Sequence, residues 1–181
     1  ADVRVASIRG LWEHECTDLI PPLLQILKCD DSPSVRAEAA LALGRFVLLA
    51  EFGRLREHYF AEVVAGLRRV LDDPREMQEV RARAVEAVGP HDSAWVRQAI
   101  SEAYESGARR LKVSAVFAMG RSCEPRWLPL LLRELSSDDA ELRYEAAVAC
   151  GSVGDESAVP VLIPLLSDPD DEVKQAVVAA L

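Results

Sequence analysis

Residues 137–160 of the chain read SDDAELRYEAAVACGSVGDESAVP, and this stretch decides the fold. It opens on Ser and Asp, which favour turns and helix N-caps. The aliphatic–basic pair Leu142-Arg143 follows, and a run of small and apolar residues then leads to Gly151. Because alanine is the best helix former, the stretch predicts a helix that begins after an Asp-rich turn and ends near Gly151. A second, apolar helix is expected to begin near Pro160.

The same pattern recurs along the chain. The basic residue of the pair occurs six times, as Arg4, Arg36, Arg81, Lys112, Arg143 and Lys174. The intervals are 32, 45, 31, 31 and 31 residues. Six residues after the basic one comes Ala42, Ala87, Ala118, Ala149 or Ala180. Eight residues after it comes Gly44, Gly89, Gly120 or Gly151. We interpret these glycines as left-handed helix C-caps. Three residues after it, at an expected close contact between helices, comes Ala39, Ala84, Ala115 or Ala146.

These units resemble the HEAT repeat, and more narrowly the short HEAT-like repeats of phycobilin lyases and of many bacterial scaffold proteins. The resemblance rests on residues 137–160 and on DPDDEVK at 168–174, and it covers nearly the whole chain. It implies an all-α fold, a right-handed α–α superhelix (α-solenoid) of about ten to twelve helices stacked as antiparallel pairs, with no sheet. One unit is too short to bury its own apolar face, so neighbouring units must stack. We expect residues 1–181 to form a single array of five to six units.

One unit is longer than the others. The 45-residue interval exceeds the usual one by 14 residues, which we assign to an insertion at 45–58. Its apolar run predicts that the second helix continues past Gly44 and turns near Gly53. The inserted residues either pack on one another or form a protrusion that contacts a partner. Both ends of the array are expected to be cut from something longer. Apolar surface near Trp12 and Leu181 would then allow end-to-end self-association. The removal of a targeting signal from the start of the chain remains an alternative.

Composition narrows the classes of function. The chain has 181 residues, of which half are hydrophobic, and a net charge of −9. This balance argues against general nucleic-acid binding, since such binding needs Lys and Arg to neutralise phosphates. No apolar run approaches the roughly 18 residues of a membrane span. The four cysteines form no Cys-x-x-Cys motif, and they are Cys16, Cys29, Cys123 and Cys150. Free thiols in a reducing compartment, and hence a cytoplasmic location, are the expectation.

Residues that could carry chemistry are few. The deoxyhypusine hydroxylases, a HEAT-repeat family, bind two irons with repeated His-Glu pairs, whereas this sequence has a single pair, His14-Glu15. A di-iron site needs several histidines and carboxylates that converge. No catalytic residue, metal ligand or cofactor is therefore predicted. The recurring acidic pairs before the second helices are interpreted as N-caps. The recurring basic residues, such as Arg36 and Arg143, are expected to form a ladder of ion pairs with Asp31 and Asp138 between units.

The positions that the repeat leaves variable are more informative about function. They lie one, two, five and nine residues after the basic residue, and steps of four place most of them on one helical stripe. Stacking aligns these stripes into a concave surface that mixes apolar groups with both signs of charge, as protein interfaces do. The candidate binding residues are Leu41, Arg45, Arg83, Glu86, Val113, Phe117, Arg121, Tyr144 and Glu145. We expect Phe117 and Tyr144 to be partly accessible on one side, with Arg83 and Arg121 favouring an acidic ligand.

The leading hypothesis is a non-enzymatic scaffold or adaptor that binds a protein or peptide on the concave face. An enzyme or chromophore chaperone of the phycobilin-lyase kind, holding a tetrapyrrole on the same face, is an alternative. A DNA-repair glycosylase built on HEAT-like repeats is another, and it would need a basic groove around a flipped base. Its basic residues would be Arg83, Arg109, Arg110, Lys112 and Arg121, which form only a local patch in an acidic chain.

Overall fold

The computed structural model describes residues 1–11 and 14–181. Trp12, expected at one end of the array, lies outside the described residues. The described part contains eleven α-helices and four short 3-10 helices, and it contains no strand. The predicted all-α fold is therefore confirmed.

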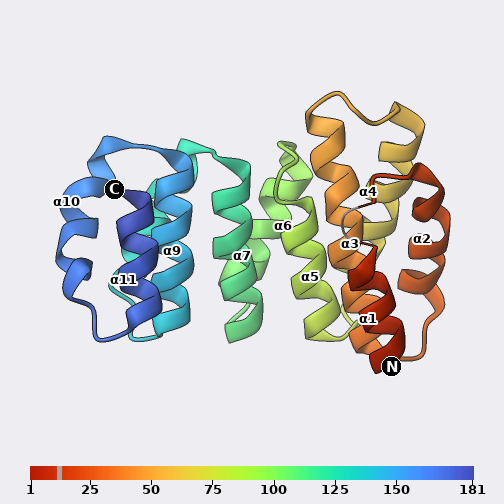
Figure 1. Ribbon diagram of the computed structural model, residues 1–181, viewed down its shortest axis with the longest axis horizontal. Helices are drawn as coiled ribbons and strands as arrows, with labels where there is room; N and C mark the ends of the chain where they lie inside the picture. The colour runs from red at the N-terminus through yellow and green to blue at the C-terminus, as the bar shows by residue number, and fades with distance from the viewer. Residues whose placement is uncertain (12–13) are drawn as a thin grey trace.

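The helices form antiparallel pairs that stack side by side in chain order (Figure 1). The first helices of the pairs are α2 (Ile20–Cys29), α4 (Glu57–Asp72), α6 (Ala94–Glu105), α8 (Leu128–Glu134) and α10 (Val159–Leu162). The second helices are α3 (Pro33–Glu51), α5 (Gln78–Val88), α7 (Arg109–Ser122), α9 (Ala140–Val153) and α11 (Asp171–Ala180). The remaining helix, α1 (Asp2–Gly10), precedes the first pair and packs on α3.

Short 3-10 helices lead into or extend several first helices. They are η1 (Thr17–Leu19) before α2, η2 (Pro125–Trp127) before α8, η3 (Glu156–Ala158) before α10 and η4 (Ile163–Ser167) after it. Proline lies in the first turn of α2, α8, α10 and η4, where the missing N–H costs no helical hydrogen bond. The Asp-rich turns cap as expected at two second helices. Asp139 accepts from the N–H of Glu141, and Asp170 accepts from those of Glu172 and Val173.

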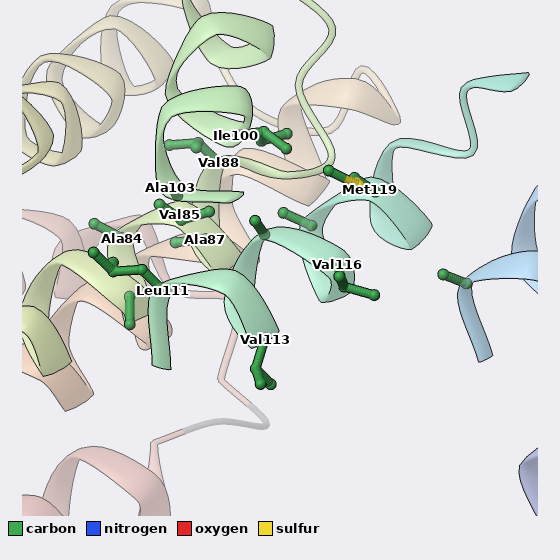
Figure 2. Packing of buried hydrophobic residues seen from close by; sticks show 14 of the residues in the cluster. Ala84, Val85, Ala87, Val88, Ile100, Ala103, Leu111, Val113, Val116 and Met119 are labelled. Atoms are coloured by element: carbon green, nitrogen blue, oxygen red, sulfur yellow. The ribbon is translucent and has the colours of Figure 1, made fainter. Parts of the chain in front are cut away.

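The second helices pack on one another in one continuous row, from α3 to α11. Their contacts bury the alanines that follow the basic residue by three positions. Ala39, Ala84, Ala115 and Ala146 are each fully buried, as predicted. Figure 2 shows this packing where α5, α6 and α7 meet. The buried alanines therefore form the core along the row of second helices. The variable stripe lies on these same helices.

The repeat glycines are not left-handed C-caps, so this interpretation was wrong. Three of them lie inside second helices, and Gly89 has a right-handed φ of −48°. The left-handed glycines are others, namely Gly53, Gly107 and Gly154.

The repeat glycines instead allow close approach between units. A Cβ added at Gly44 would lie 2.8 Å from the Cα of Ala87, and one added at Gly120 would lie 2.8 Å from the Cα of Ala149. Each glycine meets the alanine that follows the basic residue of the next unit by six positions. The four pairs are Gly44–Ala87, Gly89–Ala118, Gly120–Ala149 and Gly151–Ala180. The repeat thus encodes its own junction, a glycine on one second helix against an alanine on the next.

Ion pairs also tie each unit to the next. Two guanidinium nitrogens of Arg143, Nε and Nη2, each lie 2.8 Å from a carboxylate oxygen of Asp168. Arg36 pairs in the same way with Glu76, with its Nη2 2.7 Å from Oε1. The ladder therefore runs forward to an acid of the following unit rather than to the Asp five residues earlier, because the long side chain points across the junction.

The extra residues of the long unit lengthen its second helix. Helix α3 has 19 residues and continues past Gly44 to Glu51. The chain then turns at Gly53, whose φ of 68° suits glycine. Further along the array α11 packs on α9, and Val178 of α11 and Leu181, which follows it, are exposed. End-to-end self-association through such faces stays a prediction.

Candidate functional site

Two adjacent hollows lie along the row of second helices. The first, here called the apolar hollow, has a volume of about 440 Å³. It is lined by Glu15, Leu41, Gly44, Arg45, Leu48, Leu49, Phe52, Arg54, Glu86, Ala87, Pro90, Phe117 and Arg121. The second, here called the acidic hollow, has a volume of about 590 Å³. It is lined by Leu41, Glu79, Arg83, Glu86, Arg110, Val113, Phe117, Glu141 and Glu145. The hollows share Leu41, Glu86 and Phe117, so they form one continuous surface across α3, α5, α7 and α9.

The structure brings together most of the residues that the sequence singled out. Eight of the nine line one hollow or both, and only Tyr144 lines neither. Phe117 and Tyr144 are each partly exposed. Tyr144 occupies in α9 the repeat position that Val113 occupies in α7. Val113 and Glu86 are buried, with 3% and 7% of their surface exposed. Phe117 is therefore the aromatic group at the centre of the surface.

The apolar hollow owes its depth to the extended helix α3. Leu48 and Leu49 lie on the additional turns of this helix, and Phe52, at its C-cap, is 67% exposed. Sequence register could not assign these residues, because the other units have no equivalent of residues 45–58. The apolar run of the insertion was the signal that pointed to them.

Charged groups surround the apolar hollow. Glu15 accepts from two arginines, with its carboxylate oxygens 3.1 Å from Nη2 of Arg45 and 2.5 Å from Nη2 of Arg54. Arg121 is exposed and makes no hydrogen bond or ion pair with any residue that the structure describes. The hollow thus combines apolar walls with a guanidinium group that has no carboxylate partner among the described residues.

A polar network fills the wall between the two hollows. Glu86 of α5 accepts from the Ser114 hydroxyl at 2.6 Å, from Arg83 at 2.7 Å and from Arg110 at 3.1 Å. Arg110 also donates to Glu79 at 2.9 Å. Such a network satisfies the buried carboxylate and orients both guanidinium groups. Arg83, expected to meet a ligand, is therefore engaged within the protein, and Arg121 is the arginine that remains for a partner.

Glu145, by contrast, has no hydrogen-bond partner among the described residues. Burial raises the pKa of Glu145 to about 7, the nearby charges of Glu86 and Glu141 add to the rise, and Arg110 opposes it. Glu145 therefore exchanges its proton near neutral pH, at the edge of the acidic hollow.

This raised pKa makes a prediction about stability. Between the ordinary pKa of 4.5 and about 7, folded Glu145 holds a proton that the unfolded chain has released, so its contribution to stability falls as pH rises. Glu145→Gln should raise the free energy of unfolding at pH 8 by about 1–2 kcal/mol. This is less than the full pKa shift would give at about 1.36 kcal/mol for each pKa unit, because the side chain keeps some contact with water. Urea denaturation at pH 5 and pH 8 measures the effect, which should be smaller at pH 5. Glu105→Gln, which makes the same charge change at an exposed position, should show no such difference. Equal shifts in the two variants would contradict the assignment.

The described residues do not fit the iron site that a resemblance to the hydroxylases would require. Residues 1–11 and 14–181 contain no group of three or more His, Cys, Asp and Glu side chains that could hold a metal ion. Glu15 pairs with arginines, and Nδ1 of His91 lies 2.7 Å from Glu51. Among the described residues there is also no helix with the length and apolar character needed to cross a membrane.

The fold is an α-solenoid of stacked helix pairs with a hollowed surface along its second helices. A family model described as HEAT repeats matches residues 1–89 and 96–181. The chain belongs to the HEAT-repeat family.

Curated relatives include deoxyhypusine hydroxylases. The human (Homo sapiens) protein is 30% identical over 118 residues, which are 62% of this chain and 38% of that protein. The protein of Candida albicans is 28% identical over 85 residues, 46% of this chain and 27% of that protein. The chain thus spans well under half the length of these relatives.

Solved structures share the fold at low identity. A designed armadillo repeat protein in complex with peptide (KR)4 superposes with a TM-score of 0.59 at 19% identity, covering 96% of this chain and 83% of that chain. Human deoxyhypusine hydroxylase in complex with glycerol gives a TM-score of 0.53 at 19% identity, covering 98% of this chain and 77% of that chain. At these identities the similarity shows the fold alone.

Proposed function

We propose that the chain is a binding module that holds a peptide segment of a partner protein in the two connected hollows. The observation that carries this proposal is the gathering of eight variable-stripe residues on one hollowed surface. Phe117 stands where the hollows meet and is partly exposed, so it is the natural anchor for a bulky side chain.

The chemistry of the surface supports this function. It places exposed apolar groups beside arginines and carboxylates, the mixture found in peptide and protein interfaces. A solenoid of the same fold, the designed armadillo repeat protein, is in complex with a peptide. The polar network around Glu86 uses its charges internally, which indicates that it stiffens the surface rather than reacts with a substrate.

Selection from a random 12-residue peptide library on the purified chain, followed by affinity measurements, tests the proposal. Phe117→Ala should weaken the selected peptides by about 2 kcal/mol or more, which is roughly 30-fold, as expected for a hot spot. The helical circular dichroism signal should not change, since Phe117 is partly exposed.

Met77→Ala provides the matched control. Met77 is 55% exposed and lies outside both hollows, so its removal should leave the affinity unchanged. Selected peptides that bind the Phe117→Ala variant as tightly as the unaltered chain would place the binding surface elsewhere and refute the proposal.

A further inference from the structure

We propose that the apolar hollow takes an acidic peptide segment, in which a bulky apolar residue is flanked by Asp or Glu. This inference rests on the proposed function, because it names the chemistry of the partner that the same surface would hold.

The hollow has the size and walls for one large apolar side chain. Its volume of about 440 Å³ lies within the range of about 300–1,000 Å³ that is typical of ligand sites. Its apolar lining includes Leu41 and Leu48 of α3, Phe117 of α7, and Pro90, which follows α5. Phe52, 67% exposed, adds an aromatic ring to the lining. This ring, together with Phe117, offers aromatic contacts of the kind that anchor bound partners.

The charges around this hollow favour an anion. Three arginines line it, Arg45, Arg54 and Arg121, against two carboxylates. One carboxylate, Glu15, is shared by Arg45 and Arg54. The other, Glu86, accepts hydrogen bonds from Arg83, Arg110 and Ser114. The side chain of Arg121 is thus left to donate to a carboxylate of a ligand, in the charge-assisted and often bidentate geometry that guanidinium groups favour.

An acidic side chain fits this geometry better than a carboxyl terminus does. Capture of a carboxyl terminus usually relies on a nest of free backbone N–H groups. The hollow is lined mainly by residues within helices α3, α5 and α7, whose backbone N–H groups are used in helical hydrogen bonds. The donors are therefore side chains on an open surface, and a carboxylate in the middle of a peptide can reach them.

The overall charge of the chain separates a local acidic-peptide site from non-specific electrostatic attraction. With a net charge of −9, non-specific attraction would favour a basic peptide over an acidic one. A preference for the acidic peptide therefore requires a local site of the opposite sign.

Three fluorescein-labelled peptides, (DF)4, (NF)4 and (KF)4, test the inference by fluorescence anisotropy at low salt. Hydrogen bonds to a charged group contribute enough for (DF)4 to bind about 10-fold more tightly than (NF)4. Arg121→Ala should weaken (DF)4 more than (NF)4 and so reduce this advantage to less than about 2-fold, because the charge-assisted hydrogen bond is the stronger of the two. Arg75→Ala removes the same charge from an exposed position outside both hollows and should preserve the advantage.

The outcomes separate this inference from the proposed function. If (KF)4 or (NF)4 binds at least as tightly as (DF)4, and Phe117→Ala weakens that binding, the acidic preference is overturned while the peptide-binding function stands. If the Arg121→Ala and Arg75→Ala variants lose the same affinity for (DF)4, the acidic preference is likewise overturned while the peptide-binding function stands. If Phe117→Ala changes the binding of none of the three peptides, both the inference and the proposed function fail.

Discussion

Replacing both Gly44 and Gly120 by alanine should lower the free energy of unfolding by about 2–4 kcal/mol. Each new Cβ would lie 2.8 Å from a Cα of the neighbouring second helix, at Ala87 or Ala149. Backbone atoms cannot rotate aside as a flexible side chain can, so the two units must move apart along their whole junction. The better helix propensity of alanine, worth up to about 1 kcal/mol at each site, offsets part of the cost. Thermal or urea denaturation measures the loss.

Gly10→Ala is the matched control for this pair. Gly10 also lies in a helix, α1, but a Cβ there would meet none of the surrounding described atoms within 4 Å. The same substitution should therefore leave the stability unchanged or raise it slightly. A Gly44→Ala/Gly120→Ala variant as stable as the Gly10→Ala variant would show that the glycines do not set the distance between units.

Asp168→Asn should lower the free energy of unfolding by about 2–3 kcal/mol at pH 7, since it removes one partner of an ion pair at a largely dry junction. The side chains of Arg143 and Asp168 are only 13% and 6% exposed. Hydrogen bonds from Arg143 are the main cause that holds the pKa of Asp168 below its ordinary value of 3.8. The stabilisation is therefore present above pH 3.8 and is lost as pH falls through the lower, folded pKa. Urea denaturation from pH 7 down into the acid range measures both effects.

Asp138→Asn supplies the comparison at the same net charge. Asp138 is exposed and lies in the equivalent turn of the preceding unit, between α8 and α9, so its replacement should change stability by less than about 0.5 kcal/mol. If the two variants lose the same stability, the ladder of ion pairs contributes nothing beyond general charge.

The sequence predicted those parts of the fold that depend on local rules. The helix pairs could be placed from the Asp-rich turns, the alanine-rich helices and the 31-residue register. The same register correctly predicted the burial of Ala39, Ala84, Ala115 and Ala146. The function of the repeat glycines was misjudged for a physical reason. A glycine near a helix end has the same sequence context whether the chain needs its φ or the absence of its Cβ, and only the neighbouring helix decides between the two.

The site was predictable to a similar extent. Helical periodicity placed eight of nine candidates on one surface, because residues four apart share a helix face whatever surrounds them. Periodicity could not show that Arg83 is held by Glu86, since the network also needs Ser114 and Arg110 from the next unit. It also gave no position for Leu48 and Phe52, which lie in a segment without counterparts in the other units.

The uniform junction of glycine against alanine has a consequence for how such a protein can change over evolutionary time. Because four successive junctions use the same two small residues, a duplicated or deleted unit would meet its new neighbour through a contact that already fits. The variable stripe uses other repeat positions on the same helices, so its residues can diversify while the two small residues stay unchanged, even at the Gly44–Ala87 junction that also lines the apolar hollow. Recombination between units can therefore lengthen the array and reshuffle its specificity in one step, with no new core to invent.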